Sequence, residues 1–351
     1  ALNGPMAAQG LQYSTSEGHK PLRVWIAAQM QAIGIPAAPD NILITSGSQQ
    51  ALDYLGKLFL SPGDTALVGW PTYLGALGAF NAYEPRYDKL DPLSNRSGAD
   101  YTAAAKDAGG AAKFAYLSVD FANPTGATVS RAARERVIDL AEEMEIAVIE
   151  DAAYQSLRFD GDPIPPILAL EAARKGGDLE ACRTIYCGSF SKTLSPGLRV
   201  GWVCAAMPVI SQLVLMKQAA DLHSATLNQI AISSVAEQHF ESHIDTIRSA
   251  YRARRDAMLA ALEAHMPKGV SWTKPEGGMF IWVTLPDTLD GAELLKQSLE
   301  SERVAFVPGH AFFADGSGRN TLRLSYSTST EDKIAEGIER LGQLISRALN
   351  V

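Results

Sequence analysis

The segment that decides the fold runs from Cys182 to Ala206 and reads CRTIYCGSFSKTLSPGLRVGWVCAA. Its two ends, residues 182–187 and 200–206, are apolar and typical of buried strands, and a turn rich in hydroxyl groups and glycine joins them. Lys192 lies in this turn, shortly after the first strand. Desolvation at the end of a buried strand favours the neutral amine of a lysine over its ammonium form. We therefore expect Lys192 to be a nucleophile.

The neighbours of Lys192 predict a phosphate site. Ser189, Ser191 and Arg199 offer hydroxyl donors and a guanidinium fork, which are the groups that hold a phosphate. A neutral amine can also attack a carbonyl carbon and form a Schiff base. An aldehyde that carries a phosphate is pyridoxal phosphate, so the segment indicates this cofactor. For the segment taken alone, a solvated surface lysine is the alternative interpretation.

Apolar segments typical of strands alternate with helical segments from about residue 40 to residue 206. Strands are predicted at 41–45, 65–70, 114–119 and 145–149, and helices at 21–33, 49–60 and 130–145. This order is typical of an α/β fold with a mostly parallel sheet sandwiched by helices. A long helix at about 244–265 and shorter segments after it predict a smaller C-terminal α/β domain. We expect a large cofactor-binding domain at 12–238, a small domain at 239–351, and the remnant of an N-terminal arm at 1–11.

Polar side chains follow several of the predicted strands, and they are Ser48, Tyr73, Asn123, Asp151 and Lys192. In open parallel sheets, ligands bind beyond the carboxyl ends of the strands. We therefore expect these residues, which are distant in the sequence, to converge at one edge of the sheet.

Each candidate residue suits one part of the cofactor or substrate. Asp151 is the acidic group that should pair with the pyridine nitrogen, and Tyr73 is the aromatic ring that should stack on the cofactor ring. Asn123 and Tyr154 are the donors that should bond the ring oxygen. A helix amino terminus binds phosphate (Ser48 and Gln49), and an arginine fork binds a carboxylate (Arg323). Each residue also has an ordinary alternative. These are a turn cap for Asp151, a plain turn at Asn123, core packing for Tyr73, a half-buried ring with its hydroxyl in solvent for Tyr154, a helix cap for Ser48 and Gln49, and a solvated strand face for Arg323.

The overall charge argues against a nucleic-acid partner. The formal net charge is −8 and the isoelectric point is near 5.3, whereas phosphate backbones require a basic surface. The sequence has no apolar segment of membrane-spanning length, so we expect no membrane partner. The three cysteines lie in apolar, strand-like segments, which favours buried, reduced thiols and a cytoplasmic location. No pair of them has zinc-ligand spacing, so no metal is expected.

Together these segments resemble the class I/II aminotransferases of pyridoxal-phosphate fold type I. The resemblance is nearest to the subgroup of the 2-aminoadipate and kynurenine aminotransferases and the MocR regulators. The motifs run in family order over nearly the whole chain. They are LQYSTSEG at 11–18, TSGSQQAL at 45–52, PTY at 71–73, NPTG at 123–126, EDAAY at 150–154, GSFSK at 188–192, GGMF at 277–280, PG at 308–309 and RLS at 323–325.

The resemblance implies a function and a set of roles. Lys192 is expected to bond to the cofactor and to move the substrate proton, while Arg323, with Asn123, binds the substrate α-carboxylate. The roles proposed above for the other residues agree with the family pattern. Tyr13 is expected to reach the phosphate of a neighbouring subunit, which implies a homodimer with shared active sites. The implied reaction is ping-pong transfer of an amino group from an L-amino acid to a 2-oxo acid, with 2-oxoglutarate as the expected acceptor.

Some features depart from the family pattern, and two other functions stay open. Ala152-Ala153 stands where family members often carry a pair such as Asp-Pro, and Trp70 stands where an acidic residue is common. The family usually has a further segment before Leu11 that forms a flap over the substrate. A lyase on the same fold would share the cofactor chemistry, and the effector domain of a MocR-type regulator would share the fold.

Overall fold

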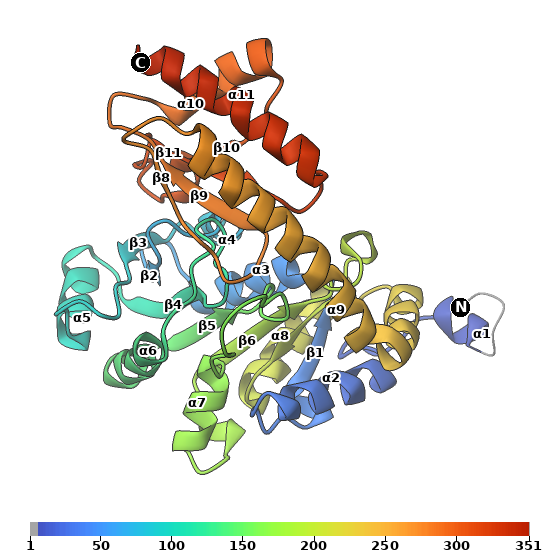
Figure 1. The fold of residues 1–351 in the computed structure, drawn as a ribbon. Helices are drawn as coiled ribbons and strands as arrows, with labels where there is room; N and C mark the ends of the chain where they lie inside the picture. The colour runs from blue at the N-terminus through green and yellow to red at the C-terminus, as the bar shows by residue number, and fades with distance from the viewer. Residues whose placement is uncertain (1–5, 351) are drawn as a thin grey trace.

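A seven-stranded sheet forms the centre of the larger part of the chain in this computed structural model, which describes residues 6–350 (Figure 1). The strand order is β1-β7-β6-β5-β4-β2-β3. The strands are β1 (Ile42–Thr45), β2 (Thr65–Val68), β3 (Arg86–Lys89), β4 (Ala112–Ser118), β5 (Ala147–Asp151), β6 (Thr184–Ser189) and β7 (Gly201–Cys204). The four strands predicted between residues 41 and 149 are all present, with ends that differ by at most two residues.

The sheet is mostly parallel, as predicted. Strands β3, β2, β4, β5 and β6 pair in parallel, whereas β7 is antiparallel to both β6 and β1. Because β7 runs against both of its neighbours, β1 points in the same direction as β6. The carboxyl ends of β1, β2, β4, β5 and β6 therefore lie at one edge of the sheet, where ligands of such folds bind.

Helices cover both faces of this sheet. One face packs against α3 (Ser48–Phe59), α4 (Leu74–Asn81) and α8 (Met207–Ala220). The other face packs against α2 (Lys20–Ala32), α5 (Gly98–Asp107), α6 (Arg131–Met144) and α7 (Ile167–Arg174). Neighbouring strand residues such as Leu43 and Ile44 enter opposite cores, because side chains alternate along a strand. The strands are apolar on both faces for this reason.

A second, four-stranded antiparallel sheet has the order β10-β11-β9-β8. Its strands are β8 (Ser271–Trp272), β9 (Phe280–Thr284), β10 (Val307–Pro308) and β11 (Thr321–Ser325). Leu262, Ile281, Leu322 and Leu341 belong to its core, to which α10 (Gly291–Gln297) and α11 (Glu331–Leu349) contribute. This unit agrees with the smaller C-terminal α/β unit predicted from the sequence.

One helix, α9 (Thr226–His265), contributes to the cores of both sheets (Figure 1). It begins 18 residues before the predicted start at residue 244, and the predicted domain boundary at 238/239 falls inside it. In its first half, Ile232 belongs to the core between α2 and the large sheet. Polar residues between the apolar ones obscure the helical period of the sequence there, so this half was not predicted as helix. Neither this helix nor any other within residues 6–350 is both long and apolar enough to cross a membrane. The division at 238 stays a prediction.

The amino-terminal segment forms a short helix. Of the predicted arm remnant at 1–11, residues 1–5 lie outside the described residues, and Ala7–Gly10 forms the helix α1.

The three cysteines are buried free thiols, as expected, and they are Cys182, Cys187 and Cys204. Burial raises the pKa of Cys182 to about 12 and raises the pKa of the other two thiols as well. Buried thiols of this kind are unreactive.

A buried arginine fixes the loop between β4 and α6. Arg134 is fully buried and donates 2.7 Å from Nη2 to the carboxylate of Asp120, which is 3% exposed. Its guanidinium also donates to the carbonyl oxygens of Val119, Val129, Ile164 and Pro165. This loop carries Asn123 to the carboxyl edge of the sheet, so the arginine links the stability of the domain to the position of a predicted site residue.

We expect the Arg134→Leu variant to lose about 3–5 kcal/mol of unfolding free energy, because it leaves a buried carboxylate without its main partner. Urea unfolding followed by circular dichroism measures this loss. The matched control is Arg131→Leu on the same helix, whose exposed ion pair with Glu135 should contribute little. Equal stability of the two variants would contradict the prediction.

Candidate active site

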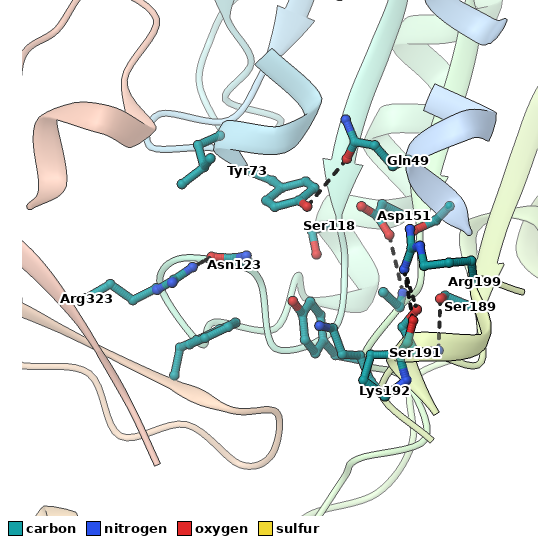
Figure 2. A pocket seen from close by; sticks show the side chains of 16 residues that line it. Gln49, Tyr73, Ser118, Asn123, Asp151, Ser189, Ser191, Lys192, Arg199 and Arg323 are labelled. Carbon is teal, nitrogen blue, oxygen red and sulfur yellow. Dashed lines mark hydrogen bonds between the residues drawn. The ribbon is translucent and has the colours of Figure 1, made fainter. Parts of the chain in front are cut away.

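The loops at the carboxyl edge of the large sheet enclose a cavity of about 350 Å³, together with residues of β9 and β11 (Figure 2). Eleven of the twelve predicted site residues line it: Ser48, Gln49, Tyr73, Asn123, Asp151, Tyr154, Ser189, Ser191, Lys192, Arg199 and Arg323. The convergence follows from the strand directions, since β1, β2, β4, β5 and β6 each end at this edge. The twelfth residue, Tyr13, lies elsewhere.

Lys192 is half-buried in the loop between β6 and β7. Its Nζ lies 6.0 Å from the centre of the Tyr154 ring. Burial lowers the pKa of Lys192, the positive charges of Arg199 and Arg323 lower it further, and only Asp151 acts in the opposite direction. A larger fraction of the side chain is therefore in the neutral, nucleophilic form at neutral pH than for an exposed lysine.

Asp151 is the last residue of β5 and is only 4% exposed. Burial raises its pKa, whereas hydrogen bonds from the Tyr116 hydroxyl (2.8 Å) and the Ala153 N–H (3.3 Å) act in the opposite direction. The hydrogen bond from the Ala153 N–H is the turn cap that was the alternative interpretation of Asp151. Asp151 therefore both caps the turn and lines the cavity. A cationic ring nitrogen placed opposite this carboxylate would be stabilised by its negative charge.

Tyr116 was missed in the sequence analysis. It lies on β4, next to β5, and its hydroxyl is the only side-chain donor to Asp151 among the described residues. The available signal was a hydroxyl-bearing residue inside an otherwise apolar strand, two positions before the strand end.

Arg323 and Asn123 form the opposite wall of the cavity (Figure 2). Arg323 lies on β11 and donates from Nη1 to Asn123 Oδ1 over 2.6 Å. Its guanidinium carbon lies 4.2 Å from the centre of the Phe280 ring and 5.1 Å from that of Phe312. The buried Nε has no partner among the described residues. The solvated-face alternative for Arg323 is therefore wrong: the side chain is half-buried, and part of its donor capacity is unused.

The amino terminus of α3 and Arg199 form the other end of the cavity. Gly47 precedes the helix with φ of +82°, and a Cβ atom there would lie 2.4 Å from an Arg199 nitrogen. A Cβ on Gly201 would lie 2.7 Å from the Ser48 nitrogen. Glycine at both positions lets the guanidinium and the first helical N–H groups share one small space, which is an anion site by its donor set. Arg199 Nη1 also lies 3.4 Å from Ser191 Oγ.

Tyr73 precedes α4 and lines the cavity, and its hydroxyl lies 3.5 Å from Gln49 Oε1. Sequence reasoning missed five other lining residues, which are Leu74, Ser118, Ala153, Pro196 and Phe280. The Ser118 Oγ is buried and has no hydrogen-bond partner among the described residues. Its position at the end of β4, in register with Asp151, was the signal that could have identified it.

Tyr13 is not part of this cavity. It is 79% exposed, and its ring lies edge-on to that of His223 with 6.0 Å between the ring centres. Its predicted role at the active site of a neighbouring subunit stays a prediction.

Comparison with known proteins identifies the family. The chain matches the family described as "Aminotransferase class I and II" over residues 6–341. It is 42% identical to aromatic-amino-acid aminotransferase 1 of Thermococcus litoralis, over 98% of this chain and 82% of that protein. It is also 42% identical to the 2-aminoadipate transaminase of Thermus thermophilus, over 97% of this chain and 82% of that protein. A solved structure of Pyrococcus horikoshii kynurenine aminotransferase in complex with PMP aligns with a TM-score of 0.90 and 42% identity, over 100% of this chain and 86% of that one. With the fold and the cavity agreeing, the chain belongs to the class I and II aminotransferase family.

Proposed function

We propose that this chain is a pyridoxal-phosphate-dependent aminotransferase that moves an amino group from an L-amino acid to a 2-oxo acid by a ping-pong mechanism. The observation that carries the proposal is the arrangement of Lys192 and Asp151 in one cavity between two arginines. The lysine has a lowered pKa, the carboxylate is buried, and Arg199 and Arg323 lie at opposite ends. Two separated arginines suit a ligand pair with a phosphate at one end and a carboxylate at the other.

The residues present fit pyridoxal phosphate. The glycine-lined space beside Arg199 and α3 suits the phosphate, the buried carboxylate of Asp151 suits a protonated ring nitrogen, and the unpartnered Ser118 Oγ and Arg323 Nε leave donors free in the cavity. When bound, the cofactor supplies an electron sink for the bonds of the substrate Cα.

The side chains then have distinct tasks in this proposal. Lys192 would hold the cofactor covalently, and its neutral amine would accept and return the proton of the substrate Cα. Asp151 would keep the ring nitrogen protonated, and Tyr73 would stack on the ring. Asn123 and Tyr154 would bond the ring oxygen, and Asn123 and Arg323 would hold the α-carboxylate. The residues that would hold the phosphate are Ser48, Gln49, Ser189, Ser191 and Arg199.

We propose 2-oxoglutarate as the amino acceptor and an amino acid with an aromatic or long side chain as the donor. The relatives named for aromatic amino acids, 2-aminoadipate and kynurenine support this range. The apolar side chains of Leu74 and Phe280 in the cavity wall are consistent with an apolar substrate side chain.

Two further parts of the proposal concern assembly and location. The exposed Tyr13, placed outside its own cavity, supports a homodimer in which it reaches the partner's phosphate site. The buried free thiols support a reducing, cytoplasmic location.

The test is to incubate the purified protein with pyridoxal phosphate, 2-oxoglutarate and each of a panel of L-amino acids. We expect glutamate and a new 2-oxo acid in equal amounts, without ammonia or carbon dioxide. Release of either gas would favour a lyase or a decarboxylase on the same fold. Cofactor binding without turnover of any amino acid would favour the effector domain of a regulator.

We expect Arg323→Gln to reduce kcat/KM for the amino acid by about 10²-fold, mostly through a higher KM, because charge-assisted hydrogen bonds to the carboxylate contribute about 1.5–3 kcal/mol. Steady-state kinetics with the best donor measures the effect. Arg319→Gln is the control, since that side chain is 80% exposed near the same strand. An unchanged KM in the Arg323 variant would assign the carboxylate to another group.

A further inference from the structure

An ion pair with one buried member, Lys217, lies behind the turn that opens α3. Lys217, near the end of α8, has a side chain with 0% exposure. Its Nζ lies 2.9 and 3.0 Å from the two carboxylate oxygens of Asp221, one helical turn later. None of the roles given above to the cavity residues uses this pair, and neither residue lines the cavity.

The pair is connected to the turn by Gln50 and Ser46. Lys217 Nζ donates to Gln50 Oε1 (2.9 Å), and Gln50 Nε2 donates to Asp221 Oδ2 (2.7 Å). The same Gln50 oxygen accepts the backbone N–H of Ser46 (2.9 Å), and the Ser46 hydroxyl lies 3.4 Å from Asp221 Oδ2. The backbone at 46 and the first turn of the helix at 50 are therefore held by one cluster. Ser48 and Gln49, which line the cavity, lie between these two points.

Charge explains why the cluster needs both members. Burial lowers the pKa of Lys217, and Asp221 opposes this effect. Partial burial alone would raise the pKa of Asp221, but hydrogen bonds from Gln50 and Lys217 hold this pKa below its ordinary value. An unpaired ammonium next to the positive end of α3 would be unfavourable, so the carboxylate makes the buried lysine tolerable there.

The cavity side of the same turn is held by different groups. The Arg199 guanidinium lies against Gly47, and Gly201 lies against the Ser48 nitrogen, with no room for a Cβ at either glycine. The turn is thus fixed on one side by the groups that face the cavity and on the other by the ion pair. A shift of the turn toward α8 would require the hydrogen bonds among Lys217, Asp221 and Gln50 to break.

We propose that Lys217 and Asp221 are positioning residues for cofactor binding, which hold the backbone N–H groups of Ser48 and Gln49 at the place where the cofactor phosphate binds. This inference rests on the proposed assignment of the phosphate to Ser48, Gln49 and Arg199. It predicts an effect confined to the phosphate, since neither residue lies near the groups proposed for the ring or the substrate.

The experiment compares the affinity of the full chain for pyridoxal phosphate with its affinity for pyridoxal, which lacks the phosphate, by fluorescence titration. We expect Lys217→Met to reduce the ratio of the two affinities by about tenfold or more, the size of loss typical when a supporting partner behind a ligand is removed. Inorganic phosphate should also compete less well in the variant. Asp221→Asn carries the same test in a milder form if the lysine variant fails to fold.

The controls separate positioning from stability and from the phosphate assignment itself. Arg255→Met removes another buried cation that pairs with partly exposed carboxylates, those of Asp160 and Asp256, and should leave the affinity ratio unchanged despite a similar loss of stability. Arg199→Met should lower the ratio strongly. A normal ratio in both cluster variants, together with a low ratio in Arg199→Met, would overturn the positioning role alone. A normal ratio in Arg199→Met would overturn the phosphate assignment on which the inference rests.

Discussion

Replacing Lys192 with alanine is expected to reduce kcat by about 10⁴-fold, the upper range for loss of one proton-transfer group. Within residues 6–350, Lys192 is the only lysine in the cavity wall, and its lowered pKa suits both covalent bonding and proton transfer. No other lining residue of this part of the chain has an amine to replace it. The measurement is the rate of 2-oxo acid formation in single-turnover and steady-state assays, together with the absorption band of the covalently bound cofactor, which should be lost.

The variant should still bind the cofactor without a covalent bond, because the phosphate and ring contacts are unchanged. Lys296→Ala is the matched control: this lysine is exposed on α10 and pairs only with Glu293 among the described residues. It should retain full activity and the absorption band. Turnover by Lys192→Ala close to that of the control would remove Lys192 from the proposed chemistry.

Most of the large domain could be predicted from the sequence because its strands are buried on both faces. A buried parallel strand appears as a short apolar run, and the polar residue that ends it marks the sheet edge. Asn123, Asp151 and Lys192 could be placed together for this reason before any contact was known. Their convergence depends on strand direction alone, which the alternation of strands and helices fixes.

Contacts between distant segments could not be predicted in the same way. Arg323 reads as a solvated charge on a strand, since nothing local indicates that Phe280, Phe312 and Asn123 surround it. The start of α9 was misplaced because a helix that packs against two cores has no single apolar stripe. The ion pair of Lys217 and Asp221 has the ordinary i, i+4 spacing of an exposed helix pair, and only the fold buries the lysine.

The second large effect is expected for Asp151→Asn, which removes one negative charge while keeping nearly the same volume. We expect kcat to fall by about 10²–10³-fold, comparable to the loss of one preorganised electrostatic group in other active sites. The amide can still accept from the Ala153 N–H, so the turn should persist. Steady-state kinetics and thermal unfolding of the variant would separate lost activity from lost stability.

Tyr116→Phe shows whether the charge or the hydrogen bond of Asp151 matters. It removes the donor to Asp151 Oδ2 and leaves the carboxylate in place. Because the Tyr116 hydroxyl lowers the pKa of Asp151, its loss should raise that pKa further. The carboxylate would then become protonated at a higher pH as the solution is acidified. As pH falls, the activity of Tyr116→Phe should therefore begin to decline at a higher pH than that of the wild type, while its maximum rate changes little. If Tyr116→Phe instead lost as much activity as Asp151→Asn at every pH, the geometry imposed by the hydrogen bond, rather than the charge, would be the main contribution of Asp151.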